Sequence, residues 1–196
     1  MQNTLHPKTN EPKIVMIGDS LAGKTSIIIQ LIKKTFDNSI EPTIGVSYAP
    51  TTIETENGPV TVKVWDTAGQ ERFRNLVPIY LRNADAAILV IDLTSPDSYD
   101  HRFDWINCVE EANQNRTKIY IVANKIDLES KIQPEEIEMW AKEDAYKFFI
   151  TTAKDHESVK AVFSQIVRDL EAEGKVFATP ITEPIREPRT HSNSCC

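Results

Sequence analysis

The hydrophobic pattern of this chain alternates between short apolar runs and longer amphipathic segments. Continuous apolar runs of strand length predict strands that are covered on both faces of a sheet. These runs are residues 13–17, 86–92 and 118–124, and a shorter strand is expected at residues 148–151. Apolar residues at helical spacing predict helices at residues 25–34, 97–115, 134–147 and 157–173. Alternating strands and helices are typical of an α/β fold.

One pair of segments has a different pattern. Residues 59–66 carry valine at every second position, and with residues 44–54 they flank the dipeptide Asn57-Gly58. Asn-Gly favours a tight turn between neighbouring strands, so these segments are predicted to form an antiparallel hairpin. The expected fold is therefore a mostly parallel sheet of about six strands, with one antiparallel strand near its edge and helices on both faces.

Composition divides the chain into one domain with two polar ends. Residues 1–12 are polar with two prolines and are expected to form a disordered arm, whereas residues 13–173 hold all the predicted elements. Residues 174–196 contain recurrent prolines and few large apolar side chains, which is typical of a flexible tail. A chain of 196 residues is long enough for one domain with a substantial core.

Charge and cysteine content exclude some classes of function. The formal net charge of −7 argues against a nucleic-acid-binding protein, which needs a basic face to neutralise phosphates. The three cysteines, Cys108, Cys195 and Cys196, have no metal-binding spacing and make a disulfide framework improbable, which favours a reducing compartment. Because neither a signal peptide nor an apolar run of membrane-spanning length is found, we expect a cytoplasmic protein.

The first candidate site is a phosphate-binding loop. Residues 18–25, Gly-Asp-Ser-Leu-Ala-Gly-Lys-Thr, match the pattern G-x-x-x-x-G-K-[ST] between a predicted strand and a predicted helix. Such a loop directs backbone N–H groups and the helix N-terminus at a phosphate. Lys24 can reach the outer phosphates, and the Thr25 hydroxyl can ligate Mg²⁺. The residues expected to contact the nucleotide here are Ser20, Leu21, Ala22, Gly23, Lys24, Thr25 and Ser26.

A second motif indicates which base is bound. In Asn124-Lys125-Ile126-Asp127, the Asp127 carboxylate can accept hydrogen bonds from the ring N–H and the amine of guanine, whereas adenine would leave that charge unpaired. Lys125 can lie along the ring, and Asn124 can tie neighbouring loops together. This motif alone is weak, because a polar loop often follows a strand. It is strengthened by Thr152, Ala153 and Lys154 after another predicted strand, where a backbone N–H can bond the guanine carbonyl.

A third motif, Asp66-Thr67-Ala68-Gly69-Gln70, follows the second hairpin strand. Asp66 can hold a water molecule of the Mg²⁺ shell, and Gly69 allows its N–H to approach a γ-phosphate. Gln70 can orient the attacking water, because phosphoryl transfer depends mainly on positioning and charge stabilisation. A strand end followed by a turn would explain the glycine but not the whole string.

These motifs resemble the Ras superfamily of small GTPases over roughly residues 12–173, and within it the Rab family. The segments that carry the Rab resemblance are residues 44–48, 65–71, 72–76, 80–84 and 89–94, together with Pro42-Thr43-Ile44-Gly45. The resemblance implies a three-layer P-loop GTPase fold, binding of GTP and GDP with Mg²⁺, and slow GTP hydrolysis. It also implies a switch that recruits effectors in vesicle traffic from the cytosolic face of an endomembrane.

The resemblance also implies roles for further residues. Thr43 would join Mg²⁺ and the γ-phosphate in the GTP state, and Phe36 would contact the guanine. Lys24, Thr43 and Gln70 would be the catalytic residues, and Thr25, Thr43 and Asp66 the metal-binding ones. Ile44, Tyr48, Trp65 and Tyr80 would contact effectors. Simple core packing is the alternative for the aromatic residues among them.

The resemblance also implies partners for this protein. An activating protein, an exchange factor, a prenylation escort, a GDP-dissociation inhibitor and effectors are implied. No catalytic arginine is identified in this chain, so hydrolysis is expected to be slow until a partner supplies one. Two other functions remain open. One is a P-loop small-molecule kinase, but such a kinase is not expected to have the second and third motifs. The other is a nucleotide-bound scaffold that cycles little. Tyr48, where Phe is usual, Thr152, where Ser is commoner, and Leu81 and Asn83 depart from the Rab pattern.

The ending predicts a lipid anchor. Cys195 and Cys196 close the chain, and Rab proteins that end in two cysteines carry geranylgeranyl groups. One lipid binds a membrane only marginally, and residues 174–196 have a net charge of only +1, so a second lipid rather than a basic patch has to supply the second anchor. We expect an intact mass that includes two lipids for protein purified from its own cells. A Cys195→Ser, Cys196→Ser variant that keeps its membrane association would contradict this prediction.

Overall fold

The computed structural model describes residues 11–37, 39, 41–43, 45–70, 76–113 and 116–175. Ile44, Cys195 and Cys196, most of the predicted arm and nearly all of the predicted tail lie outside the described residues. The strands are β1 (Lys13–Ile17), β2 (Val46–Thr55), β3 (Gly58–Thr67), β4 (Ala86–Asp92), β5 (Lys118–Asn124) and β6 (Lys147–Ile150). The helices are α1 (Lys24–Lys33), α2 (Val77–Leu81), α3 (Pro96–Asp100), α4 (Arg102–Asn113), α5 (Pro134–Glu143) and α6 (His156–Ala172).

The sheet has the strand order β2-β3-β1-β4-β5-β6. Every neighbouring pair is parallel except β2 and β3, which form an antiparallel hairpin over residues 46–67. Gly58 stands at the turn of this hairpin with a φ of +117°, a conformation that glycine adopts without a Cβ clash. The predicted fold class is confirmed.

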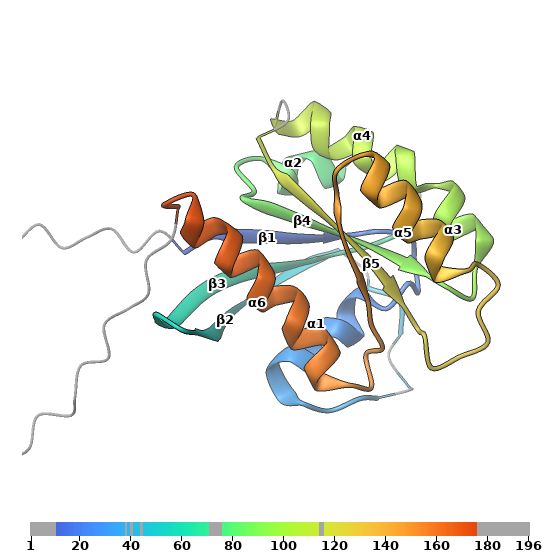
Figure 1. Cartoon of the computed structure of the whole chain (residues 1–196), viewed down its shortest axis with the longest axis horizontal. Coiled ribbons are helices and arrows are strands. Elements are labelled where there is room, and N and C mark those ends of the chain that lie inside the picture. The colour runs from blue at the N-terminus through green and yellow to red at the C-terminus, as the bar shows by residue number, and fades with distance from the viewer. Residues whose placement is uncertain are drawn as a thin grey trace, which may run out of the picture.

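Helices cover both faces of the sheet (Figure 1). On one face, α1 and α6 bury Ile27, Phe163 and Ile166 against the strands. On the other, α2 to α5 bury a second apolar cluster that includes Trp105. All seven residues of β4 are buried, as expected of a central strand with helices on both sides. None of the described helices is both long and apolar enough to cross a membrane.

The helical segments differ from the sequence prediction at three places. The single helix expected at residues 97–115 is broken at His101, where the backbone leaves helical geometry (φ −76°, ψ 0°). The helix that begins at Pro134 ends at Glu143 rather than residue 147, because Ala145 adopts a left-handed conformation before β6 begins. Helix α2 was not predicted, since its five residues include a proline and carry too little periodicity.

Candidate functional site

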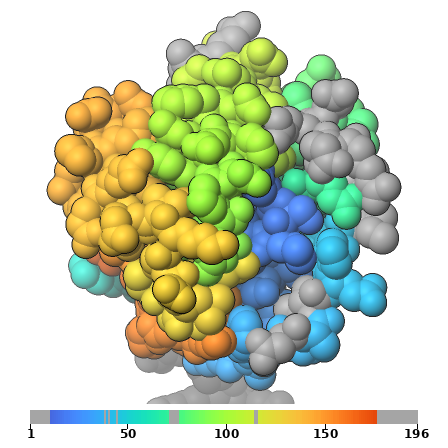
Figure 2. Space-filling model, turned by 90° about the vertical axis from the view of Figure 1, so that its right-hand side faces the viewer, coloured from blue at the N-terminus to red at the C-terminus, as the bar shows by residue number. Residues whose placement is uncertain are grey.

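A cavity of about 370 Å³ opens where the strands β1, β3, β5 and β6 end. Figure 2 shows the face of the molecule on which the lining segments meet. It is lined by Ser20, Leu21, Gly23, Lys24, Thr25, Ser26, Phe36, Asp37, Glu41, Pro42, Thr43, Gly69, Asn124, Lys125, Asp127, Leu128, Thr152, Ala153 and Lys154. Fifteen of the sixteen residues expected to bind nucleotide therefore line one cavity, and Ala22 is buried beside it. Asp37, Glu41, Pro42 and Leu128 were not predicted.

The loop between β1 and α1 surrounds a buried ammonium group. Gly18 and Gly23 have φ values of +128° and +100°, which turn the chain sharply between strand and helix. Nζ of Lys24 donates to the carbonyl oxygens of Gly18 (2.9 Å) and Asp19 (2.7 Å). Burial lowers the pKa of Lys24 to about 8, although the carboxylates of Asp66 and Asp19 favour the charged form. Such an ammonium would be strongly stabilised by an anionic ligand in the cavity.

Gly69 brings the segment after β3 against this loop. A Cβ atom at Gly69 would collide with the backbone of Asp19 and with the Lys24 ammonium, so only glycine fits. Gln70, the next residue, does not line the cavity. Its predicted catalytic role stays a prediction.

Three oxygen-bearing side chains, those of Thr25, Thr43 and Asp66, meet near Lys24. The Thr25 hydroxyl lies 2.7 Å from the Thr43 hydroxyl and 2.7 Å from Oδ2 of Asp66. Asp66 is 5% exposed, and its Oδ1 is buried with no hydrogen-bond partner among the described residues. Burial raises the pKa of Asp66, and the hydrogen bonds from Thr25 and Thr43 together with the charge of Lys24 oppose that rise.

This group of oxygens fits a magnesium ion. Mg²⁺ takes oxygen ligands only and is commonly held by one or two carboxylates, waters and substrate phosphates. Two hydroxyls and a carboxylate with an unpartnered oxygen provide such a set. The part of the chain that the structure describes holds no cluster of three His, Cys, Asp or Glu side chains, which a site of this kind does not need.

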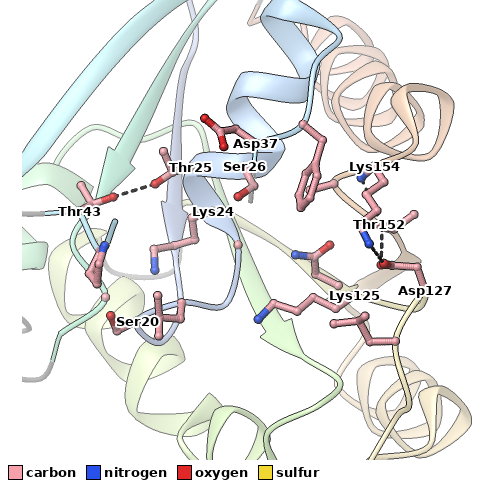
Figure 3. A pocket seen from close by; sticks show the side chains of 18 of the residues that line it. Ser20, Lys24, Thr25, Ser26, Asp37, Thr43, Lys125, Asp127, Thr152 and Lys154 are labelled. Atoms are coloured by element: carbon pink, nitrogen blue, oxygen red, sulfur yellow. Dashed lines mark hydrogen bonds and ion pairs between the residues drawn. The ribbon is translucent and has the colours of Figure 1, made fainter. Parts of the chain in front are cut away.

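The opposite end of the cavity is built around Asp127 (Figure 3). Its carboxylate accepts a hydrogen bond from the Thr152 hydroxyl (2.6 Å) and pairs with the Lys154 ammonium (2.7 Å). Burial raises the pKa of Asp127, but the hydrogen bonds from Lys154 and Thr152 outweigh it and hold the pKa below its ordinary value. Asp127 is therefore a charged acceptor. Phe36 lies near it, with the Lys154 ammonium 5.4 Å from its ring.

The other two polar residues of the second motif, Asn124 and Lys125, are held by buried partners. Asn124 Nδ2 donates to the Ala22 carbonyl (2.8 Å), and its Oδ1 accepts from the Thr151 hydroxyl (3.2 Å). This confirms the expectation that Asn124 ties neighbouring loops together. Lys125 Nζ pairs with Oδ2 of Asp92 at 2.6 Å. Asp92 was missed by the sequence analysis, although a carboxylate at the end of a buried strand was a signal that could have identified it.

The three predicted effector residues that the structure describes, Tyr48, Trp65 and Tyr80, form a row across the hairpin and α2. The rings of Tyr48 and Trp65 stack with their centroids 5.2 Å apart, and Tyr80 follows at 6.2 Å. Tyr48 is 58% exposed, whereas Trp65 is half-buried against the core below β3. The row is therefore a surface feature that is also anchored in the core, and its role with effectors stays a prediction.

Comparisons with known proteins identify the family to which the chain is similar. The model of the Ras family matches residues 13–172. Ras-related protein RHN1 of Nicotiana plumbaginifolia is 34% identical over the full length of both chains. Ras-related protein Rab-13 of Bos taurus is 36% identical over 81% of this chain and 79% of its own. GTP-binding protein ypt5 of Schizosaccharomyces pombe is 36% identical over 86% of this chain and 82% of its own.

The lowered pKa of Lys24 predicts proton uptake when a nucleotide binds. Between about pH 8 and 10.5 the folded, ligand-free protein binds fewer protons than the unfolded chain, so its stability should rise with pH in that window. Phosphates would restore the charge of Lys24. At about pH 8.5, binding of GDP should therefore take up roughly 0.7 proton, and at about pH 7 almost none. Calorimetric titrations in buffers of different ionisation enthalpy measure this uptake, and equal uptake at both pH values would contradict the prediction.

A second prediction concerns the base. Asp127→Asn should weaken GDP binding by about 10–100-fold, because an amide cannot accept hydrogen bonds from both guanine donors. Xanthine carries an oxygen where guanine has its amine, so binding of xanthosine diphosphate should improve in the same variant. Competition titrations with the two diphosphates provide the measurement. The prediction fails if the unchanged protein binds ATP and GTP equally well, or if the variant does not change its preference.

Proposed function

This chain belongs to the Ras family of small GTPases, which bind guanine nucleotides and hydrolyse GTP, and we propose that it acts as a Rab-like, Mg²⁺-dependent switch in vesicle-mediated membrane traffic. Its GTP state recruits effectors, and its GDP state releases them. The rival interpretations are a scaffold that cycles little and a small-molecule kinase.

One observation carries the proposal. The hydroxyls of Thr25 and Thr43 and the carboxylate of Asp66 come from three separate segments and meet within hydrogen-bond distance below Lys24. Thr25 belongs to the phosphate loop, Asp66 to the end of β3, and Thr43 to the segment before β2. A ligand that carries a γ-phosphate can therefore be sensed by Thr43. Loss of the γ-phosphate would remove the contact that holds Thr43 in this position. A segment that is held in only one of the two nucleotide states is what a switch requires.

The division of chemical work follows from the residues. Mg²⁺, when bound by Thr25, Thr43 and Asp66, neutralises charge on the phosphates. The Lys24 ammonium stabilises the outer phosphates, and the N–H of Gly69 can donate to a γ-phosphate oxygen because no Cβ blocks it. Gln70 orients the attacking water. An arginine supplied by an activating protein would add about 10³–10⁵ in rate.

The Rab assignment rests on the relatives and on the surface. Several relatives carry Rab names, among them Ras-related protein Rab5 of Nicotiana tabacum at 36% identity. The exposed Tyr48 and the Tyr48–Trp65–Tyr80 row provide a surface for an effector. The proposed cycle includes an activating protein, an exchange factor, a prenylation escort and a GDP-dissociation inhibitor. It runs between the cytosol and the cytosolic face of an endomembrane, with residues 13–173 as the GTPase domain and Cys195 and Cys196 as the lipid sites.

Single-turnover hydrolysis separates the candidates. Protein loaded with GTP should release phosphate without an acceptor substrate, and hydrolysis should stop when a chelator removes Mg²⁺. A scaffold would retain GTP, and a kinase would need a second substrate. Magnesium-independent hydrolysis would overturn the metal assignment while leaving the family unchanged.

Gln70→Leu should slow this intrinsic hydrolysis by about 10–100-fold, because the attacking water loses its orienting group. Binding of GTP should change little, since Gln70 does not line the cavity. Hydrolysis stimulated by an activating protein that supplies its own glutamine would survive the substitution. A Gln70→Leu protein that hydrolyses GTP at the unchanged intrinsic rate would refute the assigned role.

A further inference from the structure

The side chain of Asp19 belongs to the phosphate loop but is not part of the cavity lining. Oδ1 of Asp19 accepts a hydrogen bond from Nε1 of Trp105 at 2.8 Å. Oδ2 accepts one from Nδ1 of His101 at 2.7 Å. A loop residue between β1 and α1 is thereby joined to His101, which lies between α3 and α4, and to Trp105 on α4, both more than eighty positions away in the sequence.

The backbone of Asp19 is a structural part of the phosphate site. Its carbonyl oxygen accepts a hydrogen bond from the Lys24 ammonium at 2.7 Å and from the Ala22 N–H at 3.3 Å. The same peptide lies against Gly69, where a Cβ atom would collide with it. Any rotation of this peptide would therefore displace the ammonium and the segment that follows β3.

We propose that Trp105 is a positioning residue for the nucleotide: through its indole N–H it fixes Asp19, and Asp19 in turn fixes the peptide that aims Lys24. This inference rests on the cavity being the nucleotide site. Trp105 never touches the nucleotide, and its effect passes entirely through Asp19.

Burial decides which of the two donors matters more. Trp105 is fully buried and the Asp19 side chain is only 19% exposed, so the hydrogen bond between them is largely shielded from water. The side chain of His101 is 45% exposed, and water can replace its contact. His101 and Trp105 are four residues apart, and the backbone N–H of Trp105 donates to the His101 carbonyl (3.3 Å). The break of the helix at His101 is thus part of the arrangement that directs both side chains at Asp19.

The chain offers a matched control for the test. Trp140 on α5 is almost as buried as Trp105, at 9% exposure, and its indole nitrogen has no hydrogen-bond partner among the described residues. Its ring packs edge-on against Tyr99 and Phe103. Trp→Phe at either position removes similar ring volume from the same apolar cluster, but only at position 105 does it also remove a hydrogen bond to the phosphate loop.

The experiment measures dissociation of a fluorescent GDP analogue from the full chain, together with the midpoint of thermal unfolding. Trp105→Phe should release the analogue about tenfold faster than the unchanged protein, as expected for loss of one hydrogen bond to a charged group. Trp140→Phe should lower the unfolding midpoint with the dissociation rate unchanged. Equal acceleration by both variants, or none by Trp105→Phe, would overturn the proposal.

Variants at the other end of the bond keep the test decisive even if Trp105→Phe does not fold. Asp19→Ala should accelerate release, and Asp19→Asn, whose amide oxygen can still accept the indole N–H but which loses the carboxylate charge near Lys24, should accelerate it less. The double variant Asp19→Ala, Trp105→Phe should release the analogue no faster than Asp19→Ala alone, because Asp19→Ala has already removed the bond to Trp105. Multiplying effects would overturn the proposal. If the unchanged protein fails to bind the analogue, the nucleotide-site assignment itself is wrong, and this inference falls with it.

Discussion

The buried ammonium group of Lys24 is the constraint on which the organisation of this molecule depends. A buried charge is costly unless it is paired and hydrogen-bonded. Two backbone carbonyls and the nearby carboxylates of Asp66 and Asp19 compensate it only in part, as the lowered pKa of Lys24 indicates. An anion bound in the cavity would supply the remaining compensation. Because the carbonyl acceptors come from the loop that also begins α1, the same atoms that hold the lysine place the helix N-terminus at the phosphate position.

The sheet topology brings the other groups to this point. Strands β4 and β5 lie side by side in a register that pairs Asp92 with Asn124, the last residue of each strand. The residue that follows, Lys125, can therefore reach back to the Asp92 carboxylate, and Asn124 can reach the loop after β1. Parallel strands that end at one edge thus bring the loops that follow β1, β3, β5 and β6 to one cavity, and the segment between α1 and β2 completes its lining.

Features of the fold and the site could be predicted from the sequence where they depend on neighbouring residues, and could not where they depend on contacts between positions far apart in the chain. The bounds of β1, β4 and β5 were predicted correctly, because a continuous apolar run reports burial on both faces directly. The phosphate loop and the base motif could be identified because each is a local string. The break between α3 and α4 could not be identified, since it accompanies a long-range contact between His101 and Asp19. Asp19 itself stands at a variable position of its motif, and Asp37, Glu41, Pro42 and Leu128 line the cavity only through the path of the folded chain.

The two ends of the cavity are held with very different strength, and this difference suits a switch. At the base end, Asn124 is 1% exposed and bonded on both sides, and Lys125 and Asp127 are each ion-paired. At the phosphate end, Thr43 is held by two contacts of its own hydroxyl. One is to the Thr25 hydroxyl at 2.7 Å, and the other, at 3.4 Å, is to the Asp66 carboxylate. A ligand difference of one phosphate supplies only a limited free energy, so it can move only what is weakly held. In the proposed cycle, the base end can therefore retain guanine in both states while the weakly held Thr43 responds to the γ-phosphate.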